Sequence, residues 1–322
     1  METIVTQNPP KEPRYRGHLT PKFALQLAAP HTWPAAILPV LVAVACAAAQ
    51  GYAVPWLMAL VLLAICILMQ ASVNTFNDYF DFVKGSDTAD DNVEESDATL
   101  VYNDIDPCAA RNLAIGFLVA AFALGVYVIA RAGWVPLALG IVGALAVVLY
   151  SAGKTPVSYL PIGEAASGIV MGGVIPLACY QALTGVLDAR MLLWAVPTVI
   201  GVGLIMLTNN TCDVEKDAEA GRRTLPVLLG RARARRLYHA LVWLWLAAIL
   251  VNVAAFFTGG LLVCAFMLTA SIPLLKALLG NPLAPPARVG AMAQICSVNI
   301  ALGAFYAAAI FCGGCTDAVV LL

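Results

Sequence analysis

The sequence predicts an all-α integral membrane protein with nine transmembrane helices. Of its 322 residues, 61% are hydrophobic and only 11% are charged, whereas soluble domains carry about 25% charged residues. The apolar residues also gather into nine stretches that are long enough, or nearly so, to cross about 30 Å of hydrocarbon as helices. Composition and periodicity therefore agree on a helical membrane domain.

The expected elements follow in chain order. Residues 1–27 are polar and Pro-rich and lack the apolar core and cleavage site of a signal peptide, so we expect a cytosolic N-terminal arm. Residues 28–322 are expected to form one transmembrane domain. Its nine spans are predicted, to within a few residues, at 28–49, 54–76, 112–131, 134–151, 162–183, 190–208, 236–257, 260–279 and 289–311.

The basic residues predict how the chain is oriented. Nine spans place four loops on the side of the N-terminus, at 77–111, 152–161, 209–235 and 280–288. Of the 18 Lys and Arg residues, only Arg131 and Arg190 fall on the opposite side. Because cytoplasmic loops carry an excess of Lys and Arg, we expect a multi-pass protein of the cell membrane with its N-terminus and these loops in the cytoplasm.

Two polar strings interrupt the apolar pattern where the second and sixth spans reach this side. The first motif is Asn74-Thr-Phe-Asn77-Asp78-Tyr-Phe-Asp81-Phe-Val-Lys84-Gly85-Ser-Asp87, and the second motif is Asn209-Asn210-Thr-Cys-Asp213-Val-Glu215-Lys216-Asp217. In each motif an Asp follows an Asn by four residues, which indicates a weak internal repeat. Acidic residues at the end of a membrane helix are costly and usually functional. We therefore expect the motifs to meet over one cavity.

Helical spacing predicts what the two motifs bind. Residues four and seven or eight positions apart share one face of a helix, so each motif forms a polar stripe. Opposed stripes make the oxygen-rich surroundings that Mg²⁺ takes while it also binds substrate phosphates. The predicted catalytic residues are Asp78, Asp81, Asp213 and Asp217. The predicted Mg²⁺ ligands are these four residues with Asn74 and Asn209.

Basic residues near the motifs are candidates for binding a diphosphate, since Arg can contact phosphate oxygens bidentately. They are Lys84, Lys154, Lys216, Arg222 and Arg223. An alternative for Lys84 and Lys216 is that they only offset neighbouring acids. Residues 77–110 carry ten acids and one Lys, whereas 211–236 carry four acids and seven basic residues. The second loop is thus expected to lie near anionic lipid headgroups, through Arg231, Arg233, Arg235 and Arg236.

A metal-bound diphosphate at a membrane face suggests an isoprenoid substrate. The diphosphate is a good leaving group, and its departure from an allylic chain leaves a carbocation. The prenyl tail would lie among apolar helices, and aromatic faces can stabilise the cation. The aromatic candidates, for each of which plain packing is the alternative, are Tyr79, Phe80, Tyr150 and Tyr159.

The two motifs resemble the aspartate-rich motifs of the UbiA superfamily of membrane prenyltransferases. The segment from Asn77 to Asp87, and the segment from Asn209 through Gly221-Arg222-Arg223-Thr224-Leu225-Pro226, are most similar to the menaquinone-pathway branch, which acts on 1,4-dihydroxy-2-naphthoate. Ala29-Pro30-His31-Thr32-Trp33-Pro34 and Tyr159-x-x-x-Gly163-Glu164 also resemble that branch. The resemblance covers about residues 25–310.

This resemblance implies a UbiA-like fold, with nine transmembrane helices around a central cavity. It also implies Mg²⁺-dependent transfer of a polyprenyl group from an isoprenyl diphosphate to an aromatic acceptor. It implies that Asn74, Asp78, Asp81, Asp213 and Asp217 hold the Mg²⁺–diphosphate. Further residues are expected to bind diphosphate or acceptor by their place in matching motifs. They are Asn77, Asp87, Asn209, Asn210, Glu164, and Tyr150 with Lys154, which match a Tyr-x-x-x-Lys pattern of relatives.

The acceptor stays open because the sequence departs from the family pattern. Ala29 stands where many members have a basic residue, and the segment 97–107 lacks the basic residues common after the first motif. Alternative acceptors are 1,4-dihydroxy-6-naphthoate, 4-hydroxybenzoate, homogentisate, haem and a glycerol lipid. For Glu164 two roles stay open, as a partner of its helix dipole or as part of the acceptor pocket.

A rival hypothesis from another class is a membrane transporter whose acids form a cation site. The acids cluster at one membrane face and not at mid-depth, which favours the enzyme. Membrane lipid is an expected partner and nucleic acid is not, while the oligomeric state, the prenyl chain length and any pairing of Cys312 with Cys315 are left open.

Overall fold

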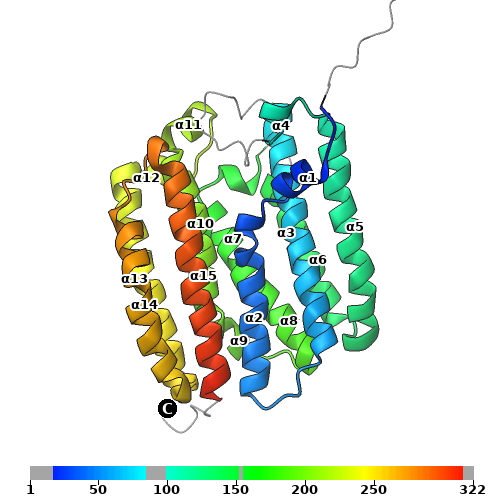
Figure 1. Ribbon diagram of the computed structural model, residues 1–322, viewed down its shortest axis with the longest axis vertical. Helices are drawn as coiled ribbons and strands as arrows, with labels where there is room; N and C mark the ends of the chain where they lie inside the picture. Colours follow the sequence, from blue (N-terminus) through cyan, green and yellow to red (C-terminus); the bar gives the residue numbers. More distant parts are fainter. Residues whose placement is uncertain (1–16, 85–98, 152–154, 315–322) are drawn as a thin grey trace, which may run out of the picture.

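The computed structural model describes residues 17–84, 99–151 and 155–314, which form a bundle of long helices (Figure 1). Within this part of the chain the only β-structure is an isolated bridge between Gly17 and Ile105. The all-α prediction is therefore confirmed. Asp87, Lys154 and Cys315 lie outside the described residues, as do most of the expected N-terminal arm and of the acidic loop.

Ten helices form the body of the bundle. They are α2 (Pro34–Ala49), α3 (Trp56–Lys84), α5 (Pro107–Ala132), α6 (Val135–Ser151), α7 (Gly163–Ile169), α8 (Ile175–Thr184), α10 (Val196–Cys212), α13 (Arg231–Phe256), α14 (Leu261–Gly280) and α15 (Arg288–Gly313). The short helices are α1 (Pro21–Leu27), α4 (Thr99–Asn103), α9 (Arg190–Trp194), α11 (Val214–Glu219) and α12 (Leu225–Leu229). A π-helical turn over Val170–Val174 joins α7 to α8.

The predicted number of nine spans is not confirmed. Among the described residues, six helical segments are long and apolar enough to cross a membrane, or seven if Pro21–Thr32 and Pro34–Ala49, which meet at a bend of 55°, count as one. Helix α10 is shorter, at Val196–Cys212, and so is the part of α6 whose side chains the structure describes without a gap, Val135–Ala146. A helix of 17 residues is about 26 Å long, which falls short of the hydrocarbon thickness. The chain is nonetheless a multi-pass membrane protein.

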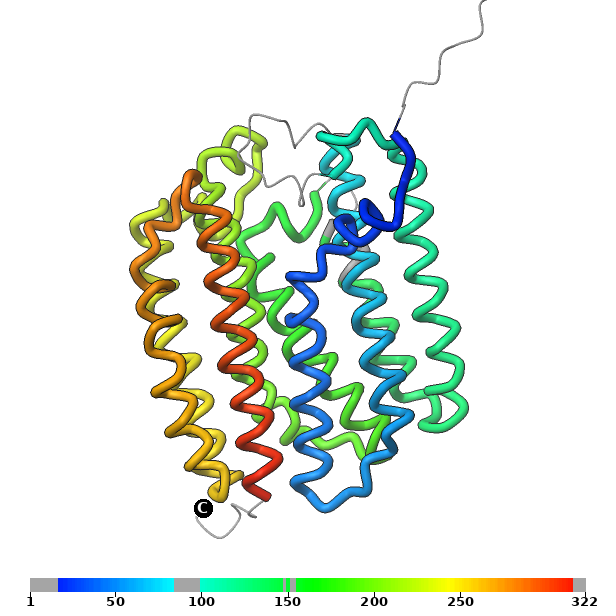
Figure 2. Tube along the Cα trace, viewed as in Figure 1, coloured from blue at the N-terminus to red at the C-terminus, as the bar shows by residue number. Residues whose placement is uncertain are grey.

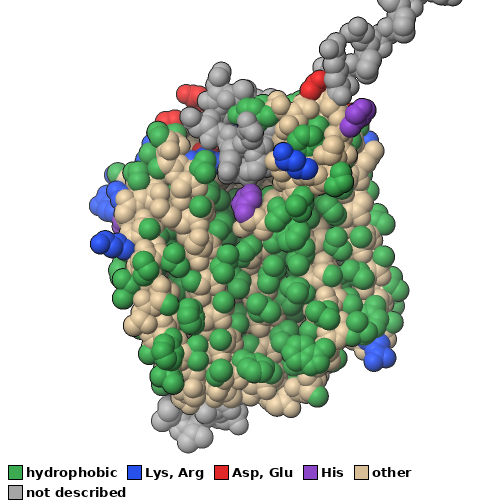
Figure 3. Space-filling model, in the orientation of Figure 1, with side chains coloured by type: hydrophobic (Ala, Val, Ile, Leu, Met, Phe, Trp, Pro, Cys, Tyr) green, Lys and Arg blue, Asp and Glu red, His purple; other side chains and the backbone are tan. Residues whose placement is uncertain are grey.

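The long helices run roughly side by side through the bundle (Figure 2). The second helix of the body, α3, packs against α5, while α2 packs against α15, α8 and α3. On the other side α10 packs against α7, α13 and α15. Figure 3 shows hydrophobic side chains over the middle of one face, with acidic side chains near the end where α4 and α11 lie. An apolar middle is what lipid requires of a membrane protein.

The loops predicted on one side of the membrane do meet at one end of the bundle, here called the motif end. Figure 1 shows α1, α4, α11 and α12 there. The backbone N–H of Arg223 donates to the carbonyl of Tyr159 at 2.8 Å, and Arg231 Nε donates to the carbonyl of Leu283 at 2.9 Å. Three loops that are distant in sequence are thereby tied together around the motifs.

Small residues let α7 approach α10 closely, which positions the helix that carries the second motif. A Cβ at Gly172, in the π-helical turn that follows α7, would lie 2.5 Å from the carbonyl carbon of Thr198, and one at Gly168 would lie 2.6 Å from the carbonyl oxygen of Val199. The Thr198 hydroxyl donates to the carbonyl of Gly172 at 2.6 Å. Backbone contact of this kind is common where membrane helices pack through glycine.

Candidate active site

A cavity of about 670 Å³ opens inside the bundle, and both motifs line it. Its polar lining lies at the motif end and includes Asn74, Asn77, Asp78, Asp81, Asn209, Asp213, Lys216, Asp217, Arg222 and Arg288. Much of the rest of the wall is apolar and includes Leu62, Ile65, Met69, Phe122, Met171 and Ile175. The structure thus brings together two motifs that lie 135 residues apart (Asp78 to Asp213), as predicted.

The first motif lies in the last turns of α3, which runs without a break to Lys84. Asn74, Asp78 and Asp81 therefore share one face of a single helix, in the predicted register. Asp78 is buried, and its Oδ2 accepts a hydrogen bond from the backbone N–H of Thr99 at 3.2 Å. The side chain of Asp81 is 31% exposed, so it stands nearer the mouth of the cavity.

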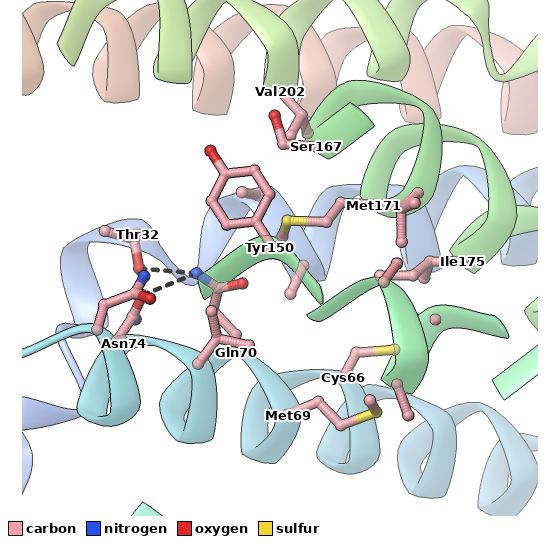
Figure 4. Close-up of a pocket in the computed structure, with 18 of the residues that line it drawn as sticks. Thr32, Cys66, Met69, Gln70, Asn74, Tyr150, Ser167, Met171, Ile175 and Val202 are labelled. Atoms are coloured by element: carbon pink, nitrogen blue, oxygen red, sulfur yellow. Dashed lines mark hydrogen bonds between the residues drawn. The ribbon is translucent and has the colours of Figure 1, made fainter. Parts of the chain in front are cut away.

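Asn74 belongs to a hydrogen-bond network that crosses from α3 to the N-terminal segment (Figure 4). Its Nδ2 donates to Thr32 Oγ1 at 2.8 Å and to the carbonyl of Ala28 at 3.0 Å. Gln70 Nε2 donates to Asn74 Oδ1 at 3.1 Å. Sequence reasoning missed Gln70, although its position four residues before Asn74 on the same helical face could have indicated it.

The second motif spans a helix break that the sequence pattern did not show. Helix α10 ends at Cys212, Asp213 lies in a turn, and α11 begins at Val214. The backbone nevertheless keeps its helical hydrogen bonds, from Asp213 N to Asn209 O at 3.1 Å and from Asp217 N to Asp213 O at 2.8 Å. All three predicted ligands therefore still line the cavity.

Arg222 connects the two motifs. A turn at Gly221, with a φ of +71°, reverses the chain after α11 so that Arg222 N donates to the carbonyl of Asp217 at 2.8 Å. Such a positive φ favours glycine. The Arg222 guanidinium lies 3.4 Å from an oxygen of Asp81 and 3.4 Å from an oxygen of Asp217. Its Cζ also lies over the ring of Tyr159, 4.8 Å from the ring centroid, which is within cation–π distance.

Arg288 is the second cation in direct contact with these acids. It is the first residue of α15, and its Nε donates to Asp213 Oδ2 at 3.1 Å. Its Nη2 donates to Asn209 Oδ1 at 2.7 Å. Sequence reasoning missed it, because Arg288 follows Asp213 by 75 residues in a Pro-rich loop that carries no motif.

Burial controls the ionisation of Asp217, which lies outside the membrane-spanning helices and is 3% exposed. Loss of water raises the pKa of Asp217 from 3.8 to about 6, although the nearby Arg222 guanidinium and a hydrogen bond from Thr224 oppose the shift. The hydrogen bond joins Thr224 Oγ1 to Asp217 Oδ2 at 3.3 Å. Near neutral pH the Asp217 carboxyl is therefore mostly ionised, and a cation that binds it would compensate for its lost hydration.

Arg231, which the sequence predicted to lie near lipid headgroups, makes contacts within the protein at the motif end. It pairs with Glu215 and holds the pKa of that carboxyl below its usual value. It also donates to the carbonyls of Thr211 at 3.2 Å and Cys212 at 3.0 Å. These are among the last carbonyls of α10, so Arg231 caps the helix just before Asp213.

Several predicted binding residues lie outside the cavity wall. Asn210 Nδ2 donates to Glu164 Oε1 at 2.8 Å, and both residues are buried away from the lining. Glu164 lies in the first turn of α7, where its charge also suits the helix dipole. The backbone of Arg223 binds Tyr159 while its side chain is exposed.

Of the four aromatic candidates, Tyr150 lines the cavity, and Figure 4 shows its ring beside Met171. Tyr79 instead packs against a small cluster around Leu27 and Leu100. Tyr159 lies under the Arg222 guanidinium, and Phe80 is absent from the described lining. The Lys84 side chain, Asp87 and Lys154 lie outside what the structure describes.

The donors at the motif end suit Mg²⁺ by type. Carboxylate and amide oxygens from both motifs line one wall, and Mg²⁺ prefers a few such oxygens together with water and substrate phosphates. In the described part of the chain, however, no three Asp, Glu, His or Cys side chains stand close enough to hold a metal by themselves. The motifs therefore supply a partial oxygen shell that substrate oxygens would complete.

Comparison with known proteins gives a consistent picture. Residues 36–298 match the model of the UbiA prenyltransferase family. A 1,4-dihydroxy-2-naphthoate octaprenyltransferase of Bacillus subtilis is 35% identical over 71% of this chain and 74% of that protein. The protein of the same name from Mycobacterium tuberculosis is 32% identical over 83% and 91%.

Solved structures share the fold at low sequence identity. A UbiA homologue from Archaeoglobus fulgidus bound to GPP and Mg²⁺ superposes with a TM-score of 0.59 at 17% identity, over 89% of this chain and 99% of that one. The apo UbiA homologue from Aeropyrum pernix gives 0.60 at 17%, over 86% and 96%. These likenesses concern the fold.

Proposed function

Since the chain belongs to the UbiA prenyltransferase family, we propose that it transfers a polyprenyl group from an isoprenyl diphosphate to 1,4-dihydroxy-2-naphthoate. One observation carries the proposal: both acidic motifs line one end of a cavity of about 670 Å³ whose wall is otherwise mainly apolar. A substrate with a polyanionic head and a hydrocarbon tail fits such a cavity. The names of the Bacillus subtilis and Mycobacterium tuberculosis relatives support the naphthoate acceptor.

The prenyl tail is assigned to the apolar wall between α3, α5, α6, α7 and α8. Side chains such as Leu62, Met69, Phe122 and Met171 offer contact surface there. Each CH₂ of the tail that leaves water contributes about 0.8 kcal/mol. This apolar contact orients the donor so that its diphosphate stays at the motif end.

The diphosphate is assigned to the motif end together with Mg²⁺. The proposed metal ligands are Asn74, Asp78, Asp81, Asn209, Asp213 and Asp217. Bound Mg²⁺ would neutralise the negative charge that develops on the leaving diphosphate. The homologue from Archaeoglobus fulgidus that was solved with GPP and Mg²⁺ supports this choice of metal and ligand.

The cations of the site are assigned to the non-bridging phosphate oxygens. Arg222, Arg288 and Lys216 line the cavity beside the acids. The Arg222 Nε–H is buried and has no protein hydrogen-bond partner, and a buried donor without a partner is costly. A phosphate oxygen would satisfy it. Lys84, Asp87 and Lys154 stay predicted contributors from beyond the described residues.

The chemistry follows from this arrangement. The bond from the allylic carbon to the diphosphate oxygen breaks, and the electron pair leaves with the diphosphate. The allylic carbocation that remains lies in the cavity, against apolar side chains that exclude water. The face of the Tyr150 ring can stabilise it there. An electron-rich ring carbon of the acceptor attacks it, and at 1,4-dihydroxy-2-naphthoate the ring carboxylate leaves as CO₂.

We place the motif end at the cytoplasmic face of the cell membrane, on the evidence of the Lys and Arg distribution. Diphosphate esters and naphthoates are charged, so a site that opens to the aqueous side is accessible to both. The transporter hypothesis is set aside, because the matched family consists of enzymes.

The test is an acceptor panel. Membranes containing the chain are incubated with labelled prenyl diphosphate, Mg²⁺ and one acceptor at a time. The panel holds 1,4-dihydroxy-2-naphthoate, 1,4-dihydroxy-6-naphthoate, 4-hydroxybenzoate and homogentisate. We expect a lipid-soluble labelled product and CO₂ release with the first. Product formed only with another acceptor would overturn the naphthoate assignment, and no product from folded protein would overturn the activity.

A further inference from the structure

The acids at the motif end are already paired with internal cations. We propose that Arg222 and Arg288 act as built-in countercations of the ligand-free site, so that a divalent metal binds tightly only together with a diphosphate. Arg222 contacts Asp81 and Asp217, and Arg288 contacts Asp213 and Asn209. The inference rests on the proposed function and adds the order in which its ligands bind.

The balance of charge in the cavity wall supports it. The described lining carries four carboxylates, those of Asp78, Asp81, Asp213 and Asp217, and three cations, those of Lys216, Arg222 and Arg288. One negative charge is left over. A single divalent ion alone would make this described set of charges positive, and Coulomb energies grow where burial limits the access of water. A diphosphate that enters with the metal brings about three negative charges, which more than offset the two positive charges of the ion.

Competition for the same oxygens leads to the same conclusion. Arg288 occupies Asp213 Oδ2 at 3.1 Å and Asn209 Oδ1 at 2.7 Å, which are two of the oxygens that the second motif would offer to a metal. Its side chain is only 13% exposed, so water screens the pair weakly. A metal that arrives alone must displace this largely buried guanidinium from both oxygens, which is costly.

A diphosphate changes that balance by giving the arginines new acceptors. Arg222 already holds an unpartnered Nε–H beside the carboxylates, and its guanidinium lies over the ring of Tyr159. When phosphate oxygens accept from Arg222 and Arg288, the oxygens of Asp213 and Asn209 become available to the metal. Binding of metal and of diphosphate is then coupled, and each raises the affinity of the other by the same factor.

The test measures Mn²⁺ binding to the purified full chain by electron paramagnetic resonance, with and without inorganic pyrophosphate as the probe. We expect pyrophosphate to raise the Mn²⁺ affinity of the wild type at least about tenfold. Arg288→Gln should raise the affinity for Mn²⁺ alone and shrink the enhancement. Arg288→Lys, which keeps the charge, should stay nearer to wild type. Arg236→Gln, at an exposed residue of α13 away from the cavity, is the matched control.

Two results would overturn the inference: wild-type protein that binds Mn²⁺ equally well with and without pyrophosphate, or Arg288→Gln that behaves like Arg236→Gln. The wild-type comparison keeps the test valid should Arg288→Gln fail to fold. A wild type that binds no Mn²⁺ even with pyrophosphate would instead reject the metal–diphosphate site of the proposed function, and the inference with it.

Discussion

Arg222 lies between Asp81 of the first motif and Asp217 of the second, with guanidinium nitrogens 3.4 Å from a carboxylate oxygen of each. The two acids are carried by α3 and α11, which belong to opposite sides of the cavity. A single planar cation thus contacts an acid of each motif and links the two. Its place over the Tyr159 ring adds a third point of attachment.

We predict that Arg222→Lys lowers kcat/KM for the prenyl diphosphate about tenfold to a hundredfold. A Lys ammonium cannot reach both carboxylates and lie over the Tyr159 ring at once, because it lacks the planar fork of the guanidinium. Losing a charged hydrogen bond of this kind costs about 1.5–3 kcal/mol. Steady-state kinetics over a range of donor concentrations measure the effect.

Arg223→Lys is the matched control, since Arg223 is the next residue and its side chain is exposed. It should keep nearly the wild-type kcat/KM. Equal losses in both variants would show that the Arg222 bridge has no special role.

The raised pKa of Asp217 predicts a pH dependence of stability. The pKa of Asp217 is about 6 in the folded chain, compared with 3.8 for an ordinary Asp side chain such as that of the unfolded chain. Between about pH 4 and pH 6 the folded state therefore holds a proton that the unfolded chain has released. The free energy of unfolding of the metal-free protein should therefore fall as pH rises through this window. Asp217→Asn should remove that contribution.

Thermal unfolding of metal-free wild type and Asp217→Asn at pH 4.5, 5.5 and 7 tests this. The wild type should lose stability relative to the variant as pH rises. Addition of Mg²⁺ with pyrophosphate should stabilise the wild type more at pH 7 than at pH 5, because the ionised carboxylate is the ligand. Parallel pH profiles of the two proteins would contradict the assignment.

Glu164 is predicted to act as a structural partner of Asn210. Glu164→Gln keeps an oxygen that can accept from Asn210 Nδ2, so stability and turnover should change little. Glu164→Leu leaves the Asn210 amide buried without this partner, which should lower the free energy of unfolding by about 1–3 kcal/mol. Denaturation in detergent micelles measures it. A large loss of turnover in Glu164→Gln with an unchanged melting temperature would instead indicate a role in the chemistry.

Close packing of the turn after α7 on α10 predicts a steric effect at Gly172. A Cβ there would lie 2.5 Å from the backbone of Thr198 and Val199, which cannot move aside without shifting α10. Gly172→Ala should destabilise by about 1–3 kcal/mol. Gly116→Ala on α5, where a Cβ would meet nothing within 4 Å, should be neutral or stabilising because Ala is the better helix former. Similar melting temperatures for the two variants would contradict the packing.

Much of the site could be predicted from sequence because helical spacing determines which residues share a face. Asn74, Asp78 and Asp81 needed only the register of one helix, and α3 provides it without a break. The second motif kept its register through the break at Asp213, because its backbone hydrogen bonds still join residues four apart.

What sequence could not predict depends on contacts between distant segments. Arg288 reaches Asp213 only because α15 packs against α10. Asn210 turns away from the cavity because Glu164 of α7 offers it a buried acceptor. The nine predicted spans are not confirmed, because helix length and apolar composition identify six or seven among the described residues, and α10 ends at Cys212 where its polar motif begins.

The central claim is that the two motifs form one metal–diphosphate site, and the turnover of Asp78→Asn, Asp213→Asn and their double variant tests it most directly. The substitution keeps the shape of the side chain and removes its charge. Each single variant should lose at least about a hundredfold in kcat, since a metal supplies several kcal/mol of transition-state stabilisation. Residues that act as one unit are not additive, so the double variant should lose little more than either single one. Independent, multiplying losses, or near wild-type activity in either single variant, would contradict a shared site.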